Sequence, residues 1–271
     1  MVVAEYRVKY TYGEEWKLKP IFDVHAGNKD CDLNEFKKFM ADSDDKTLFI
    51  GGGDLIDAVI TKDIKRYRKS ADDTDGDAII DEQIDIICEI LRPYSHKIIG
   101  LGAGNHEDTI LKYCGTNPTK RMCDILSDDK HKIQYLGYSC LVRLVFELKQ
   151  GGAVRTIIIR QHHGWGGGSR TRGANITKYE RDIGKWDADI FLYGHVHQKQ
   201  FDRTPRLGLR GLLLVSRPQL MVICGSYLKT YSTDANPTYS EVKGFPPNEI
   251  GGVTIQMKPD SHRWIDLSAV L

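Results

Sequence analysis

Apolar residues in the first half of the chain fall into short runs that alternate with segments of helical spacing. Three of these runs stop at glycine or polar residues and predict buried strands at 16–25, 47–54 and 96–108. Between them, residues 32–42 and 77–94 place apolar side chains three and four positions apart, which predicts two amphipathic helices. This alternation favours an α/β domain built in layers.

The second half of the chain is richer in predicted strands. Residues 139–148 and 153–163 are separated by Lys-Gln-Gly-Gly, which is typical of a hairpin turn. Further strands are expected at 185–197, 210–227 and 251–259, with a last edge strand within residues 262–271. No internal repeat is visible along the sequence.

Composition and charge narrow the class of protein. A formal net charge of +1 over 271 residues creates no global field toward nucleic acid or a membrane. No stretch approaches the ~20 apolar residues that cross a bilayer, so no membrane partner is expected. The first residues lack the apolar segment of a secretory signal, and the six cysteines are scattered without a CxxC pair. Both features favour a cytoplasmic protein with reduced thiols. The polar, highly charged segment 61–77 is expected to be an exposed insertion or lid.

Five of the predicted apolar runs end at residues that can bind a metal ion. These residues are Asp23 and His25; Asp54; Asn105 and His106; His162 and His163; and His195 and His197. Ligands of open α/β sheets bind outside the carboxyl ends of the strands, so residues distant in sequence can converge there. Any one of these residues alone would most often be a turn or capping residue. The recurrence at five strand ends is what predicts a metal site.

The donor types in this set indicate which metals would bind. Carboxylate, imidazole and amide oxygen donors suit manganese, iron, zinc, cobalt or nickel better than calcium. The donors outnumber what a single tetrahedral ion requires, which favours two divalent transition-metal ions. Two ions about 3.5–4 Å apart stabilise the attacking and leaving oxygens of a displacement at phosphorus.

The motifs, taken in order, resemble those of the calcineurin-like metallophosphoesterase superfamily. They are Asp23-Val24-His25, Gly53-Asp54-Leu55-Ile56-Asp57, Gly104-Asn105-His106-Glu107, His162-His163-Gly164 and Gly194-His195-Val196-His197. The resemblance covers residues 19–198. It implies a four-layer α/β/β/α sandwich of two mixed β-sheets flanked by helices, in one catalytic domain over residues 1–271 that carries the 61–77 insertion.

The resemblance also implies a role for each candidate ligand. Asp23, His25 and His197 would hold the first ion, and Asp54 would bridge both ions. Asn105, His195 and one of His162 and His163 would hold the second ion. We favour His162, because the family usually shows histidine, any residue, then glycine or proline; His163 stays open. Manganese is the favoured metal, with iron, zinc, nickel and cobalt as alternatives.

His106 is the expected catalytic residue, binding phosphate oxygens or protonating the leaving group, as its equivalent does in the family. Glu107, Asp108 or Asp57 is expected to orient its ring. In the glycine-rich segment 162–173, Arg170 and Arg172 are expected to bind the substrate phosphate, and Trp165 to stack on a base.

These observations favour a phosphoesterase that hydrolyses phosphate mono- or diesters by attack of a metal-bridging hydroxide. Its substrate is expected to be a small molecule or a nucleotide. A nuclease or DNA-repair type phosphodiesterase is a second hypothesis, kept open by the basic run 65–69 and by Trp165. A catalytically silent metal-binding scaffold is the third, and the presence of His106 argues against it. The sequence leaves the oligomeric state undetermined.

Overall fold

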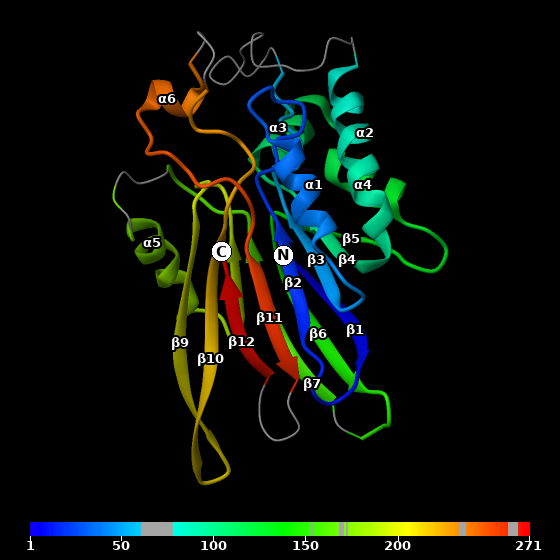
Figure 1. The fold of residues 1–271 in the computed structure, drawn as a ribbon, viewed down its shortest axis with the longest axis vertical. Coiled ribbons are helices and arrows are strands. Elements are labelled where there is room, and N and C mark those ends of the chain that lie inside the picture. The colour runs from blue at the N-terminus through cyan, green and yellow to red at the C-terminus, as the bar shows by residue number, and fades with distance from the viewer. Residues whose placement is uncertain (61–77, 153, 168–170, 172, 233–236, 260–264) are drawn as a thin grey trace.

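The computed structural model describes residues 1–60, 78–152, 154–167, 171, 173–232, 237–259 and 265–271 (Figure 1). The predicted lid at 61–77 lies outside these residues. Within the described residues, no helix has both the length and the apolar character needed to span a membrane.

Two six-stranded mixed sheets form the centre of the protein. The first has the order β1 (Val2–Tyr10), β6 (Ser139–Leu148), β7 (Val154–His162), β8 (Ile190–Tyr193), β10 (Leu213–Cys224) and β9 (Lys199–Arg210). The second has the order β12 (Ile265–Val270), β11 (Thr254–Pro259), β2 (Trp16–Ile21), β3 (Thr47–Gly52), β4 (Ile98–Gly102) and β5 (Gln134–Gly137). Both contain parallel and antiparallel neighbours.

The sheets pack face to face because alternate residues of their strands point inward. Leu48 and Ile50 of β3 lie in one apolar core with Val142 and Leu144 of β6. Phe49, between the first two, faces the opposite side of its sheet and lies in a different cluster. Strands β3, β4 and β8 are buried along their whole length, as expected of strands covered on both faces.

Helices cover the outer face of each sheet (Figure 1). The second sheet is covered by α1 (Leu33–Ala41), α2 (Ile79–Leu91) and α4 (Pro118–Leu126), and the first by α5 (Ala174–Ile183). The remaining helical elements are η2 (Arg92–Lys97), α3 (Asn105–Cys114) and α6 (Tyr239–Lys243). The layers therefore follow the order helix, sheet, sheet, helix, which confirms the predicted fold class.

Most predicted elements are present with shifted bounds, and the hairpin of β6 and β7 is paired as expected. The strand predicted through residue 108 was wrong at its end, because β4 stops at Gly102 and α3 begins at Asn105. Strands β1 and β9 and helices α4 and α5 were not predicted. Strand β1 pairs in parallel with β6, so a partner more than a hundred residues away in sequence decides its structure.

Candidate metal centre

The candidate ligands follow parallel strands that end at the same edge of the sandwich. Asp23 and His25 follow β2, Asp54 follows β3, and Asn105 opens α3 just after β4. These three strands are parallel neighbours in one sheet. His163 follows β7, and His195 and His197 follow β8, its parallel neighbour in the other sheet.

One group of donors consists of Asp23, His25 and His197. The Nε2 atoms of the two histidines lie 3.2 Å apart, and His197 Nε2 lies 3.5 Å from Asp23 Oδ1. His25 Nδ1 lies 3.3 Å from Asp57 Oδ1. A proton on Nδ1, donated to that carboxylate, leaves the Nε2 lone pair of His25 directed at the other two donors.

A second group consists of Asp54, Asn105, His163 and His195. The amide Oδ1 of Asn105 lies 3.0 Å from His163 Nε2 and 2.8 Å from His195 Nδ1. His163 Nδ1 lies 3.0 Å from the Gly52 carbonyl oxygen, to which it can donate its proton. When Nε2 carries no proton, its lone pair faces the group and could bind a metal ion.

Asp54 lies between the two groups. Its Oδ2 is 3.2 Å from His163 Nε2 in the second group and 4.0 Å from His25 Nε2 in the first. Its other oxygen, Oδ1, accepts a hydrogen bond of 2.9 Å from the His106 backbone N–H. The carboxylate is therefore held in one orientation with a single oxygen facing both groups.

The electrostatics of the cluster suit bound cations. Asp23, Asp54, Asp57 and Glu107 are all buried, and within the described part of the chain no lysine or arginine pairs with them. Asp23 Oδ1 is buried without a hydrogen-bond partner. A buried carboxylate oxygen in that state is costly unless a positive charge faces it. The residues present thus fit bound divalent metal ions.

The pKa values of the cluster reflect the same excess of negative charge. Burial alone would lower the pKa of His163, but the Asp54 carboxylate outweighs it and raises that pKa to about 9. Burial alone would raise the pKa of Asp54, but His163 and His106 hold it well below its ordinary value. The imidazolium of His163 here occupies the electrostatic position that a metal cation would take.

Backbone strain concentrates at the same residues. Six non-glycine residues of the described chain have positive φ, and five of them are Asp23, His25, Asp54, His195 and His197, at +49° to +71°. Such left-handed conformations cost on the order of 1 kcal/mol or more each and persist only where the surrounding structure imposes them. All five belong to the donor groups of the cluster.

Two glycines let the strand ends approach closely enough to form the cluster. A Cβ on Gly104 would lie 2.1 Å from Asp54 Oδ1, and one on Gly194 would lie 2.5 Å from Asp23 Oδ2. Any side chain at the position before Asn105 or His195 would clash with the carboxylate opposite it, so each of these positions requires glycine.

Glu107 does not orient His106, contrary to one expectation from the sequence. Its carboxylate accepts backbone N–H groups from Gly104 at 2.8 Å, Asp54 at 2.9 Å, Leu55 at 2.7 Å and Ile56 at 3.3 Å. Glu107 thus fixes the loop that carries Asp54. Burial and the Asp54 charge raise the pKa of Glu107, while these N–H donors favour its ionised form.

The ring of His106 is held by Asp57, the third residue considered for this role. His106 Nδ1 contacts the Asp57 carbonyl oxygen, and its Nε2 lies 3.9 Å from Asp54 Oδ2. The ring centroid also lies 4.6 Å from that of His25, so His106 lies beside both donor groups. Its side chain is 12% exposed and reaches solvent.

The structure brings His163, and not the favoured His162, into the cluster. Residues 157, 159 and 161 of β7 face the other sheet, and His163 continues that face into the cluster. His162 points the opposite way, against Trp165 at 4.9 Å between ring centroids, and its Nδ1 accepts the Gly164 N–H at 2.9 Å. Burial and Arg160 lower the pKa of His162 to about 4. Side chains of a strand alternate between its two faces. Continuing that alternation one residue past the end of β7 places His163, and not His162, on the face toward the other sheet, and this is the sequence signal that distinguishes the two histidines.

The predicted substrate-binding residues Arg170 and Arg172 lie outside the described residues. Trp165 is described, and it is 37% exposed beside His162. Its ring packs edge-on against Tyr179 and Tyr193, which fixes its orientation.

No protein-family model matches the chain, and no curated protein matches it. Among solved structures, it is similar to a conserved uncharacterised protein from Streptococcus pneumoniae, described as a predicted phosphoesterase. The two share 13% identity and a TM-score of 0.31 over 95% of this chain and 99% of that one. It is also similar to zinc-complexed Vps29 from Entamoeba histolytica, with 14% identity and a TM-score of 0.34 over 94% and 98% of the two chains.

Proposed function

We propose that this protein is a metal-dependent phosphoesterase that hydrolyses phosphate mono- or diesters at a dinuclear centre. The observation that carries the proposal is the pair of donor groups that meet at Asp54 Oδ2. A first-row ion bound by two imidazoles at about 2.1 Å keeps their nitrogens roughly 3.0–3.4 Å apart. The 3.2 Å between His25 Nε2 and His197 Nε2 fits that requirement.

Each group would hold one ion. Asp23, His25 and His197 would bind the first, and Asn105, His163 and His195 the second, with Asp54 shared. The nitrogen and oxygen donors fit manganese, iron, zinc, cobalt or nickel, and manganese remains the metal we favour. When bound, two such ions supply an activated water and neutralise charge on the phosphoryl oxygens.

The chain's own residues would then complete the reaction. Hydrolysis breaks the bond between phosphorus and the ester oxygen, and the departing alkoxide needs a proton. His106 Nε2 faces the cluster, while Nδ1 is occupied by the Asp57 carbonyl oxygen. A protonated His106 would deliver its Nε2 proton to the leaving oxygen. The Asp57 contact would keep the ring aimed during that transfer.

A polynucleotide substrate remains a second candidate function. The exposed, edge-packed ring of Trp165 beside His162 supports it, because such a ring can stack on a base of any identity. A catalytically silent scaffold is disfavoured, since a metal-binding role alone does not require His106 to be partly exposed beside the donor groups.

Loading the protein with manganese, zinc, iron or nickel and measuring bound metal tests the centre. We expect two ions per chain, with one or both lost in His163→Gln and both retained in the matched control His162→Gln. Turnover of p-nitrophenyl phosphate, bis-p-nitrophenyl phosphate, cyclic nucleotides and single-stranded DNA then defines the reaction. His106→Gln should retain metal and lose turnover. Full metal occupancy without turnover of any substrate would instead favour the scaffold.

A further inference from the structure

The hairpin of β9 and β10 extends beyond the body of the first sheet. The two strands pair along all twelve residues, from Lys199↔Cys224 to Arg210↔Leu213. Strand β8 pairs with β10 only over Leu220–Ile223. Toward its turn the hairpin is therefore a two-stranded ribbon, and it projects at the end of the molecule opposite to α3 (Figure 1). Such ribbons are marginally stable in water without further packing.

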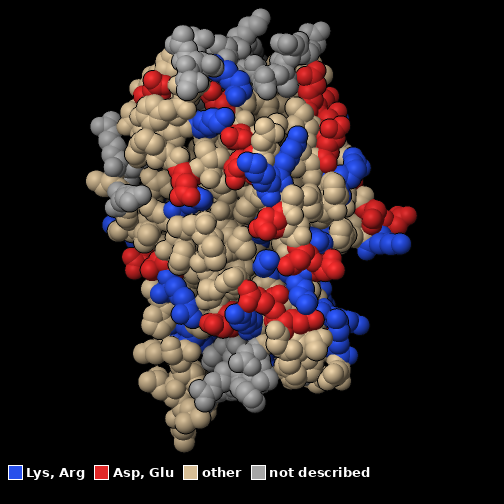
Figure 2. Space-filling model, viewed as in Figure 1, with Lys and Arg blue, Asp and Glu red and all other residues tan. Residues whose placement is uncertain are grey.

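The tip of this ribbon is unusually apolar. Five leucines between residues 207 and 214 are between 64% and 100% exposed: Leu207, Leu209, Leu212, Leu213 and Leu214. In the view of Figure 2, the far tip of the molecule shows no charged side chain. The other exposed large apolar residues of the described chain stand singly or in pairs along the sequence.

Apolar side chains lie on both faces of the ribbon. Leu209 and Leu214 are directly paired and so share one face, which Leu207 continues two residues along β9. Leu213 is adjacent to Leu214 in β10 and therefore points to the opposite face. A protein partner would cover one face of the ribbon and leave the leucines of the other in water.

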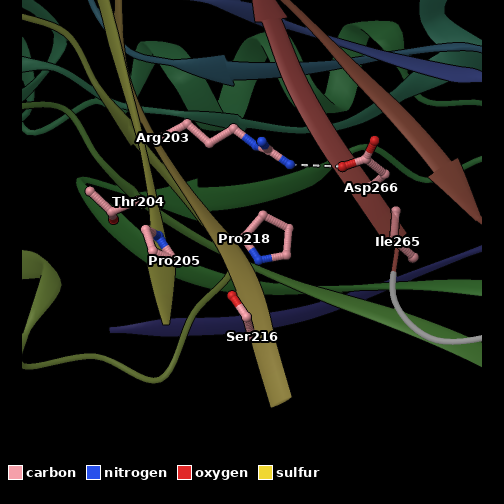
Figure 3. A pocket seen from close by; sticks show the side chains of 7 residues that line it. All are labelled: Arg203, Thr204, Pro205, Ser216, Pro218, Ile265 and Asp266. Atoms are coloured by element: carbon pink, nitrogen blue, oxygen red, sulfur yellow. Dashed lines mark hydrogen bonds and ion pairs between the residues drawn. The ribbon is translucent and has the colours of Figure 1, made fainter. Parts of the chain in front are cut away.

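The charges near the tip are of one sign. Residues 203–217 contain four arginines and no acidic residue. Arg203 and Arg206 lie at the base of the ribbon, where they pair with Asp266 at 2.9 Å and Asp187 at 2.6 Å. Arg203 also lines a cavity of about 470 Å³ between the hairpin and β12 (Figure 3). Arg206 is the cross-strand partner of Arg217, so the backbone places these two arginines together directly behind the leucine-bearing end of the ribbon.

We propose that this leucine tip inserts into the interfacial region of an anionic phospholipid bilayer. A bilayer surrounds an inserted tip and so covers both of its faces. The basic residues behind the leucines match the negative headgroups at that depth. With about 3.3 Å of rise per residue, the residues beyond Gly208 extend roughly 10 Å, which matches the depth that interfacial segments reach.

Dimerisation through the tip fits the structure less well. Stable interfaces bury about 800 Å² per partner, spread over some 20–30 residues, and this tip offers a handful of side chains at a convex end. The proposal reverses the expectation of no membrane partner, which rested on net charge and on the absence of a long apolar stretch. Eight residues at a hairpin turn change the net charge of the chain little and are too few to form a long apolar stretch.

Docking by the tip leaves the candidate metal centre at the other end of the molecule, because Asn105 and His106 open α3 (Figure 1). A docked protein would direct that centre away from the lipid, toward substrates in solution. The inference is therefore independent of the phosphoesterase proposal, and either can fail alone.

Sedimentation of the full chain with phosphatidylcholine vesicles, with and without phosphatidylglycerol, tests this inference. We expect the wild type to bind the anionic vesicles, and binding to weaken in high salt. Leu212→Ser with Leu214→Ser should weaken binding about tenfold or more, since both lose apolar surface that enters lipid. Val3→Ser is the matched control, because Val3 is 74% exposed on β1. Arg206→Gln with Arg217→Gln should reduce the preference for anionic vesicles.

The outcomes separate clearly. No binding of the wild type to either vesicle, or equal binding by the leucine variant, would overturn the proposal. A wild-type dimer in light scattering that the leucine variant dissociates would also overturn it, in favour of a second copy as the partner. Thermal unfolding of each variant verifies that it is folded.

Discussion

Replacing Glu107 by glutamine tests whether a buried carboxylate positions the bridging residue Asp54. Glu107 Oε2 accepts the N–H groups of Asp54 and Gly104, and Oε1 accepts those of Leu55 and Ile56. Glutamine keeps one acceptor oxygen and replaces the other by an NH2 donor. Two backbone N–H groups then face a donor instead of an acceptor.

The magnitude follows from those two lost acceptors. A buried N–H left without a partner costs about 1–3 kcal/mol, so two cost about 2–6 kcal/mol. Removing the negative charge beside Asp54 offsets part of this, because that charge and burial raise the pKa of Glu107. We expect a net loss of about 3 kcal/mol in the free energy of unfolding. Asp54 should also shift, since its left-handed conformation, with φ of 51°, depends on this anchor.

Urea unfolding and metal titration of Glu107→Gln measure both effects. Asp108→Asn is the matched control, because Asp108 is the next residue of α3 and its side chain is exposed. The control should unfold and bind metal as the wild type does. Wild-type stability and metal affinity in Glu107→Gln would refute the assignment of Glu107 as the anchor of the Asp54 loop.

Three further predictions concern the cluster itself. Because the pKa of His163 is raised to about 9 in the folded protein, its protonation stabilises the metal-free protein fully below the unfolded pKa of about 6.5. That contribution, about 3 kcal/mol, is lost as the pH rises through about 9 and should vanish in His163→Gln, as urea unfolding across this pH window would reveal. Metal affinity should rise over the same window, since the cation replaces the His163 proton; an affinity independent of pH would contradict this. Gly104→Ala should cost about 3 kcal/mol and most of the bound metal, because its Cβ would lie 2.1 Å from Asp54 Oδ1. Gly184→Ala, where a Cβ meets nothing within 4 Å, should be neutral in the same thermal unfolding and metal assays.

The layered fold was predictable because its strongest signals are local. Apolar runs that stop at glycine or polar residues predicted β2, β3, β4, β7 and β8, the strands that carry the candidate ligands. The elements that were missed, β1 and β9 among them, lack such runs and form only because a partner strand lies beside them. The helix α3 was missed because its first turn carries the motif Asn105-His106-Glu107, which reads as a loop when its neighbours are unknown.

By itself, the sequence determined which chemical groups are available and in what order along the chain. The recurrence of metal-binding side chains after apolar runs follows from local patterning, and so does the layered α/β class, while the four-layer order was implied by the resemblance of the motifs. The tertiary structure decided which side chains meet. The orientation of β7 places His163 in the cluster and His162 outside it. The Asp57 carbonyl oxygen holds the His106 ring, and the Glu107 carboxylate holds the loop that carries Asp54. The tertiary structure also placed five leucines at a projecting tip. These outcomes depend on contacts between residues far apart in the chain, whose distances only the packing of the two sheets sets.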